Sequence, residues 1–456
     1  AFFFSFVAWF NMAPFNTTLI RTIGLSQDQV NVLMLCNVSL TIPARILIGI
    51  LVDQFGPRRV FSYLLLFSSG VCFYFASGKN FEDFVVARLL MGIVGAGFVV
   101  GIKMIADWFP PNKMGLAQGI YAGWGNFGAA AAVFSLPAIA SFFPEETGWR
   151  VAVVLNGILC ITWGAIYFCF AKEVSEKSDR FAVGFEHCIE VTTKKDIILQ
   201  ALSLIPVYGA VAILIWKLSW HPLQFLSPAI SKILLTAIFI LYIFNVLQSV
   251  RSNLPKTYER ASAEKKYEFK QILILSLVYA LTFGSQLAVI SMFPQYLETA
   301  FDLSVATAGM VGSSFAVMNL LTRPAGGWIS DRIEKKSSLI LFVTGSMIGY
   351  AAMSQITSSW SLWSVLLLAL SCSIFLQAGT GACFAAVPLI RKDLTGQMAG
   401  MAGAYGSIGA LAFLTVFSFT SPEKFFGITA LYAAIVLLTL IFLNPFNNLH
   451  KSFETK

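Results

Sequence analysis

The amino-acid sequence predicts an all-α protein that crosses a lipid bilayer many times. Hydrophobic residues make up 57% of the 456 residues, charged residues make up 12%, and the mean hydropathy is +0.75. A water-exposed globular protein contains about twice that share of charged residues. Long apolar runs favour helices over a closed barrel, because a helix satisfies its own backbone hydrogen bonds within the lipid.

Apolar runs of about 20 residues, the length that spans the hydrocarbon core, occur in two sets of six. The first set lies at about 1–20, 32–52, 58–77, 84–106, 115–142 and 150–171, and the second at about 271–293, 304–329, 337–355, 361–390, 397–420 and 424–445. Two further runs lie between the sets, at about 197–217 and 229–250. We therefore expect four regions: a six-helix bundle at 1–171, a central region with an extra helix pair at 172–270, a second bundle at 271–445 and a tail at 446–456. The first run is interpreted as a spanning helix rather than a cleaved signal peptide.

The basic residues predict the orientation, because Lys and Arg concentrate in cytoplasmic loops. With a cytoplasmic N-terminus, the outer loops carry only Arg21, Lys79, Arg150 and Lys424. The inner loops then carry Arg58, Arg59, Lys113, Lys194, Lys195, Arg251, Lys256, Arg260, Lys265, Lys266, Lys270, Arg332, Lys335, Lys336, Arg391 and Lys392. We therefore expect both termini to be cytoplasmic, with the helices in the bilayer of the cell (inner) membrane. These loops account for the net charge of +8, so no nucleic-acid partner is expected.

The two sets of helices contain an internal repeat. Arginine, glycine and aspartate follow one another at four-residue intervals twice, 278 residues apart, at Arg45, Gly49 and Asp53 and at Arg323, Gly327 and Asp331. A second echo, 281 residues apart, relates the segments 125–128 (GNFG) and 406–409 (GSIG). Duplicated halves are typical of secondary transporters, whose substrate site lies between the repeats near the bilayer midplane.

The repeated arginines predict an anion site. Arg45 lies eight residues, or about 12 Å of helix, from Asp53, which places its guanidinium well inside the membrane. A charge there costs at least ~2.5–3.5 kcal/mol, and the acidic residues all lie in predicted loops or at helix ends. An anionic substrate is then the best counter-ion, because a guanidinium donates to two oxygens of a planar oxyanion and stays protonated. The alternative is a structural arginine bonded to helix carbonyls.

Enzymatic, metal and cofactor chemistry find no support in the sequence. The seven cysteines form no CxxC pair, and His187, His221 and His450 all lie in predicted loops. We therefore expect no catalytic residue, no metal, no cofactor and no proton-relay histidine.

Several motifs resemble one known family. The segment 49–59 (GILVDQFGPRR) resembles the loop motif of the major facilitator superfamily, and Arg88 with the glycines that follow it resembles that superfamily's fourth-helix motif. The segment 122–129 (AGWGNFGA) is similar to the nitrate signature of the nitrate/nitrite porter family, and 400–409 to its second copy. The segment 279–285 also resembles that family, and the central insert and the run 108–111 (WFPP) look most like its cyanobacterial nitrate/nitrite permeases. The resemblance implies the major facilitator fold and a monomeric carrier of nitrate and nitrite.

The repeat and the resemblance together suggest the functional residues. The expected substrate-binding residues are Arg45, Gly125, Asn126, Tyr279, Phe283, Arg323 and Ser407. The expected gating or structural residues are Asp53, Arg58, Arg88 and Asp331, with the two aspartates latching the cytoplasmic mouth. The simpler alternatives are packing for the aromatic residues and Gly125, and a solvated charge cluster for the aspartates. Ser407 departs from the family pattern, which has asparagine there, so substrate preference at this position is open.

Two other functions fit the same composition: a major facilitator carrier for another small or organic anion, and an anion sensor that does not transport. Coupling is also open, because a chain with no carboxylate inside a span lacks the usual proton carrier. Either protons move with the substrate or anions exchange. The extra helix pair is expected to be peripheral to the anion, since its strongly polar positions lie near its ends.

Overall fold

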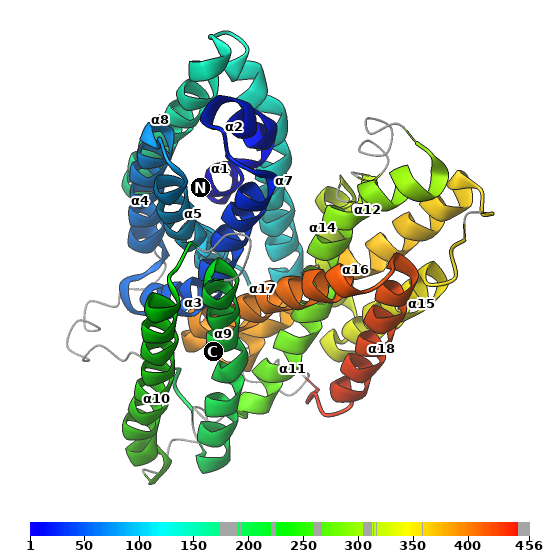
Figure 1. Ribbon diagram of the computed structural model, residues 1–456. Helices are drawn as coiled ribbons and strands as arrows, with labels where there is room; N and C mark the ends of the chain where they lie inside the picture. The colour runs from blue at the N-terminus through cyan, green and yellow to red at the C-terminus, as the bar shows by residue number, and fades with distance from the viewer. Residues whose placement is uncertain are drawn as a thin grey trace. The chain divides into compact units, whose positions relative to one another are not determined.

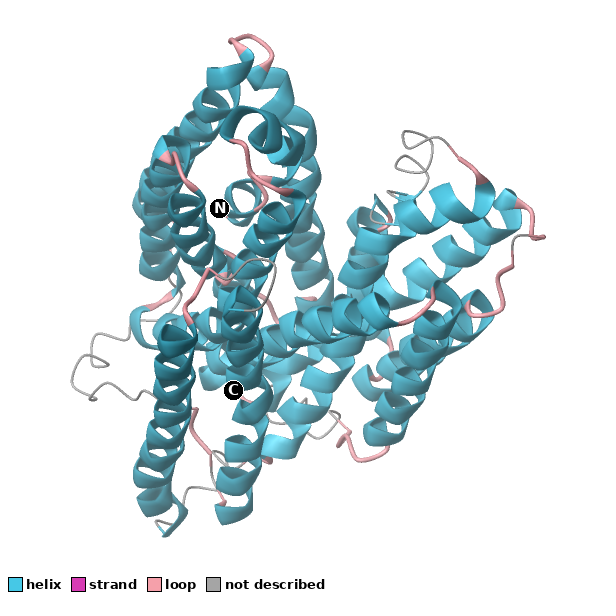
Figure 2. Ribbon diagram, in the orientation of Figure 1, coloured by secondary structure: helices cyan, strands magenta, loops and turns pink. Residues whose placement is uncertain are grey.

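The computed structural model describes residues 1–172, 189–191, 193–219, 225–258, 267–303, 312, 314–315, 317–357 and 359–445. In these residues all regular secondary structure is helical and no strand occurs (Figures 1 and 2). Eleven helices of this described part are long and apolar enough to cross a membrane. The predicted all-α, multi-pass membrane fold is confirmed.

The first repeat contains six expected spans, two of which are broken. Its elements are α1 (Phe2–Trp9), the 3-10 turn η1 (Ala13–Phe15), α2 (Asn16–Ile23), α3 (Gln27–Phe55), α4 (Pro57–Ser77), α5 (Phe81–Val94), α6 (Gly97–Trp108), α7 (Met114–Ala140) and α8 (Glu145–Phe170). The expected continuous helix over 1–20 was wrong, because the chain breaks after Trp9 and Pro14 occupies the start of the following turn. A sharper boundary separates α3 from α4, where Gly56 adopts a φ of 84° that other residues rarely adopt.

The second repeat follows the same pattern. Its elements are α11 (Phe269–Tyr279), the π-helical turn η4 (Ala280–Gly284), α12 (Ser285–Phe301), α14 (Asn319–Arg332), α15 (Lys335–Met353), α16 (Leu362–Ile390), η5 (Lys392–Leu394), α17 (Thr395–Phe419) and α18 (Pro422–Leu440). The beginning of the expected run at 304–329 lies outside the described residues, as do Cys188, His187, His221, His450 and the expected tail.

The chain divides into two compact units, each built mainly from one half of the sequence. The first unit contains residues 1–107, 124–269 and 393–400, and the second contains 108–123, 270–392 and 401–456. Each unit thus includes a short segment from the other half. These segments are the first turns of α17 and of α7, respectively.

The first unit packs α4 against α8 and α3 against α5, with Trp149 in edge-to-face contact with Phe75. It also contains the expected extra pair, α9 (Lys194–Ser219) and α10 (Pro228–Tyr258), which run side by side in Figure 1. The helix α9 packs against α3. By contrast, α10 exposes large apolar side chains such as Phe239 and Phe244, a surface suited to lipid.

The second unit packs α15 against both α16 and α18, and α14 against α16. Its core is aromatic, with Phe293, Tyr350, Phe425 and Phe426 buried together. The hydroxyl of Tyr350 donates to Ser285 Oγ at 2.7 Å and so joins this core to α12, the helix that begins after η4. This bond positions the part of the unit that carries the candidate site.

Candidate functional site

The second unit brings together three of the predicted site residues, Arg323, Phe283 and Tyr279. This arginine is 0% exposed, and its Cζ lies 5.6 Å from the ring centre of Phe283. The rings of Phe283 and Tyr279 are stacked, with centroids 5.0 Å apart and an interplanar angle of 3°. Because an atom contacts a ring face at about 3.5 Å, no anion fits between rings so close. The two rings therefore form one stacked wall beside Arg323.

The local backbone explains how these rings are positioned. Tyr279 ends α11 and Phe283 lies in the π-helical turn η4, a type of distortion that is frequent at functional sites. The helix α17 approaches this turn through glycines. A Cβ at Gly406 would collide with the ring of Tyr279, and one at Gly409 would lie 2.5 Å from the carbonyl oxygen of Ala280. Ser407, next to Gly406, is 1% exposed.

Gln286 is a site residue that the sequence interpretation missed. Its Oε1 accepts a hydrogen bond from Arg323 Nη2 at 3.4 Å, and its side chain is buried. The signal was present, because Gln286 follows Tyr279 by seven residues and Phe283 by three, which puts all three on one helical face. A glutamine inside an apolar span is costly unless it has a polar partner.

The first unit positions Arg45 on α3, where it is 1% exposed. Its main-chain carbonyl faces Gly400 so closely that a Cβ at Gly400 would collide with it. Asn37 and Thr41, eight and four residues before Arg45 on the same helix, donate to the carbonyl oxygens of Trp9 at 3.1 Å and Gly92 at 2.6 Å, respectively. These two side chains therefore join α3 to its neighbours.

The signature residues of α7 in the first unit differ in their surroundings. Gly125 lies against Phe2, and any Cβ there would collide with the phenyl ring. Asn126 is half-buried. Close packing thus accounts for the glycine, and an additional contact of Gly125 with an anion stays a prediction.

Two further arginines of the first unit hold helix ends. Arg88 donates to Trp9 O and to Asn11 Oδ1, both at 3.1 Å, and so satisfies a carbonyl freed by the break after α1. Arg58 donates from Nε to Phe168 O at 2.6 Å, near the end of α8. Both contacts are structural ones between helices.

Asp53 caps a helix that comes from the other half of the sequence. Its Oδ1 accepts from Gly396 N at 2.9 Å and its Oδ2 from Gln397 N at 2.8 Å, the second and third residues of α17. Lys103 Nζ lies 3.8 Å from Asp53 and 3.2 Å from Asp107. Lys103 is 5% exposed and lies between these two carboxylates. We call this arrangement the Asp53 cap.

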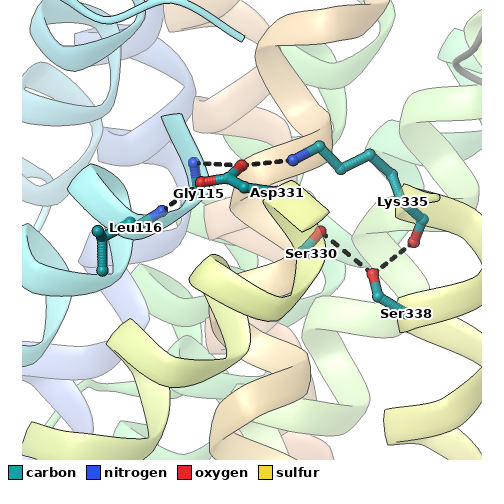
Figure 3. A network of polar contacts seen from close by, with 6 residues as sticks. All are labelled: Gly115, Leu116, Ser330, Asp331, Lys335 and Ser338. Carbon is teal, nitrogen blue, oxygen red and sulfur yellow. Dashed lines mark hydrogen bonds and ion pairs between the residues drawn. The ribbon is translucent and has the colours of Figure 1, made fainter. Parts of the chain in front are cut away.

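Asp331 makes the equivalent cap in the second unit (Figure 3). Its carboxylate accepts from Gly115 N at 2.9 Å and Leu116 N at 2.8 Å, again the second and third residues of a helix, here α7. Lys335 Nζ lies 2.6 Å from Asp331 Oδ1. Beside them Ser338 Oγ donates to the main-chain oxygen of Lys335 at 2.7 Å. We call this the Asp331 cap.

The two caps repeat the same chemistry with the same spacing. The first N–H groups of a helix have no acceptor within the helix, and the helix N-terminus carries a partial positive charge. A carboxylate at this position accepts hydrogen bonds from the N–H groups and offsets the positive charge. In each cap the helix bearing the aspartate also touches the capped helix through paired glycines. These glycines are Gly49 with Gly396 and Gly327 with Gly115. The internal repeat of the sequence is therefore a repeat of tertiary contacts.

No group of three or more His, Cys, Asp or Glu side chains that could hold a metal ion occurs in the described part of the chain. Two duplicated halves of apolar helices, each with a buried arginine and a carboxylate-capped helix, are the pattern of a secondary carrier. The model of the Major Facilitator Superfamily matches residues 1–413 and 272–456. The crystal structure of the E. coli fucose:proton symporter FucP has a TM-score of 0.63 and 14% identity, with 97% of this chain and 98% of that chain covered.

Closer relatives are similar over nearly the whole sequence. The nitrate/nitrite transporter NrtP of Picosynechococcus sp. is 41% identical over 91% of this chain and 83% of its own length. The nitrate/nitrite transporter NrtP of Nostoc punctiforme is 38% identical over 96% of this chain and 89% of its own length. The chain therefore belongs to the nitrate/nitrite porter family of the Major Facilitator Superfamily.

Proposed function

We propose that this protein carries nitrate and nitrite across the membrane by alternating access, with Arg45 and Arg323 as the ligands of the anion. The names of its relatives support the substrate class. The observation that carries the ligand assignment is the equivalence of the two arginines. Each is at most 1% exposed, and each has its main-chain carbonyl against a glycine of a signature helix, Gly400 for Arg45 and Gly119 for Arg323.

The chemistry of the arginines suits a small planar anion. A guanidinium donates two parallel hydrogen bonds to two oxygens of one oxyanion, and it stays charged at any working pH. The stacked wall of Tyr279 and Phe283 supplies an apolar surface beside Arg323. Gln286 accepts a hydrogen bond from one guanidinium nitrogen, so the side chain of Arg323 has fewer orientations to lose when the anion binds. Asn126 and Ser407 are the proposed neutral donors of the two halves.

The two caps are proposed to act as latches of the cytoplasmic mouth. Both carboxylates lie at the ends of their helices that carry the basic residues, the side that the loop charges predict to be cytoplasmic. With this orientation, both termini would be cytoplasmic. We also propose that the protein acts as a monomer in the inner membrane. Release of a carboxylate from a helix N-terminus breaks several polar bonds at once, so each latch has two discrete states.

Import of the anion requires coupling. Moving one negative charge inward against 100 mV costs about 2.3 kcal/mol, so net accumulation needs co-transported cations or exchange with an internal anion. We propose co-transported protons, carried with the substrate. Nitrate/nitrite exchange is the competing mode.

The test is transport by the purified full chain in proteoliposomes. Uptake of labelled nitrate should occur with an inward proton gradient imposed, and nitrite should compete. Uptake that depends only on internal nitrite, with no response to the proton gradient, would establish exchange instead. Binding of nitrate without any flux would identify a sensor, and flux of an organic anion without nitrate competition would assign a different substrate. Either of the last two results would overturn the proposed function.

A further inference from the structure

The central helix pair is connected to one of the two caps through a short segment without regular secondary structure, residues 189–191. Two of its residues are almost fully buried, Ile189 at 2% and Val191 at 1% exposure. Its main-chain groups are bound by side chains instead of by a helix or sheet. The N–H of Glu190 donates to Gln397 Oε1 at 3.1 Å, and the hydroxyl of Tyr267 donates to the carbonyl oxygen of Glu190.

The helix pair holds this segment by buried amides. Asn253 of α10 accepts from Val191 N at 3.0 Å and donates to Ile189 O at 3.1 Å. Gln200 of α9 also donates to Ile189 O, at 3.0 Å. Ser249 donates to Gln200 Oε1 at 2.6 Å and so joins the two helices. Because buried amides without partners are costly, this set of bonds holds the segment in one position.

Gln397 joins the segment to the Asp53 cap. Its main-chain N–H donates to Asp53, while its side-chain Oε1 accepts from Glu190. The residue is 5% exposed. A shift of α17 away from Asp53 would therefore also stretch the bond to Glu190. The equivalent residue of the Asp331 cap is Leu116, whose side chain has no polar atom to make such a bond.

The first turn of α9 is also bonded to the beginning of α11. Asp196, in the first turn of α9, accepts from Phe269 N at 3.1 Å and from Thr193 Oγ1 at 2.7 Å. Phe269 begins α11, the helix that ends at Tyr279. The inserted pair is thus bonded to the first residues of two helices that continue to the proposed anion site.

We propose that the central helix pair braces the Asp53 cap, with Gln397 as the positioning residue and Asn253 as the residue that fixes the 189–191 segment. The brace acts on one of the two caps, so the two halves open with different free energies although their carboxylate chemistry is the same. This inference rests on the proposed role of the Asp53 cap as a latch, and it gives the extra helices a part in gating without contact to the anion.

The test measures opening of each cap separately, by amide hydrogen exchange of the full chain in nanodiscs. Gln397→Leu places at this position the residue found in the other cap, and it keeps the main-chain bond to Asp53. Exchange in residues 393–400 should rise about 2- to 10-fold, the factor expected for loss of one ordinary hydrogen bond. Exchange in residues 113–118, at the Asp331 cap, should be unchanged. Asn253→Ala should have the same local effect, and the double variant should exchange no faster than the stronger single variant, because both act through one tie.

The matched control is Leu116→Gln, which adds an amide to the cap that has no bond to the 189–191 segment. It should leave exchange at both caps unchanged. In liposomes, Gln397→Leu should alter the turnover number while the dissociation constant of nitrate stays the same. Unchanged exchange at 393–400, or an equal rise at both caps, would overturn the brace. Because exchange needs no substrate, failure of nitrate transport would refute the proposed function without deciding this inference.

Discussion

Replacing Asp331 by asparagine should open the Asp331 cap without removing any heavy atom from it. The carboxylate makes three bonds, to Gly115 N at 2.9 Å, Leu116 N at 2.8 Å and Lys335 Nζ at 2.6 Å. The side chains of Lys335 and Asp331 are 6% and 4% exposed, so solvent screens this pair little. An amide retains one acceptor oxygen, and its NH2 group cannot accept a bond from a main-chain N–H.

The magnitude follows from these contacts. Loss of one hydrogen bond to a charged acceptor costs ~1.5–3 kcal/mol. The equilibrium constant for opening of the Asp331 cap should therefore increase on the order of 10- to 100-fold. The uncompensated charge of Lys335 adds to the effect, because removal of one partner of a buried pair is more costly than removal of both. The double variant Asp331→Asn, Lys335→Gln should therefore be less perturbed than Asp331→Asn alone.

Amide exchange of residues 113–118 measures this opening directly, because the N–H groups of Gly115 and Leu116 have no acceptor within α7. Glu334→Gln is the matched control. It makes the same chemical change three residues away, where the carboxylate accepts from Ser337 at the surface. If Asp331→Asn leaves the exchange at 113–118 within a factor of two of the control, the carboxylate does not hold the helix, and the latch assignment fails.

Three further predictions concern the proposed anion ligands. Arg45→Lys and Arg323→Lys should each abolish most nitrate uptake at equal expression, because an ammonium cannot form a bidentate fork; uptake like that of the unmodified protein would exclude either residue as a ligand. Asn126→Ala should weaken nitrate binding by roughly one to two orders of magnitude, because each hydrogen bond to a charged ligand contributes ~1.5–3 kcal/mol. Ser407→Ala should weaken nitrate binding less. If calorimetry gives the reverse order, the proposed equivalent roles of Asn126 and Ser407 are wrong. Gln286→Glu should weaken nitrate binding more than Gln286→Leu, because a carboxylate beside Arg323 would neutralise the guanidinium. Equal nitrate dissociation constants for the two variants would exclude contact between residue 286 and Arg323.

The helices were largely predictable because hydropathy is a local property. Every apolar run in the described residues forms helix, and the extra pair at 197–250 is present as α9 and α10. The breaks were harder to predict. At the break after Trp9, the carbonyl oxygen of Trp9 accepts from Arg88 and Asn37, which are distant in sequence, and hydropathy contains no information on such partners.

The candidate site was predictable where the internal repeat marked it, at Arg45 and Arg323, and where the family resemblance marked it, at Tyr279 and Phe283. Arg323, Phe283 and Tyr279 do lie together, and the buried position of Arg45 was also expected. Gln286 was missed because neither signal covers it: the segment that resembles the family ends at residue 285, and the equivalent position in the first repeat, position 8, is an alanine. The repeat therefore identified shared features and gave no signal for a residue that only one half possesses.

The sequence by itself determined the class of protein and the duplication, because composition, hydropathy and spacing are properties of the linear chain. It also determined that Arg45 is equivalent to Arg323, and Asp53 to Asp331, in the two repeats. Only the tertiary structure decided what these residues touch. It assigned both aspartates to the first turns of helices from the opposite half of the sequence, and it connected the Asp53 cap to the central pair through Gln397 and Glu190. The physical reason is that a buried polar group takes its partner from whichever helix packs beside it, and contacts between residues more than two hundred positions apart leave no periodic trace in the sequence.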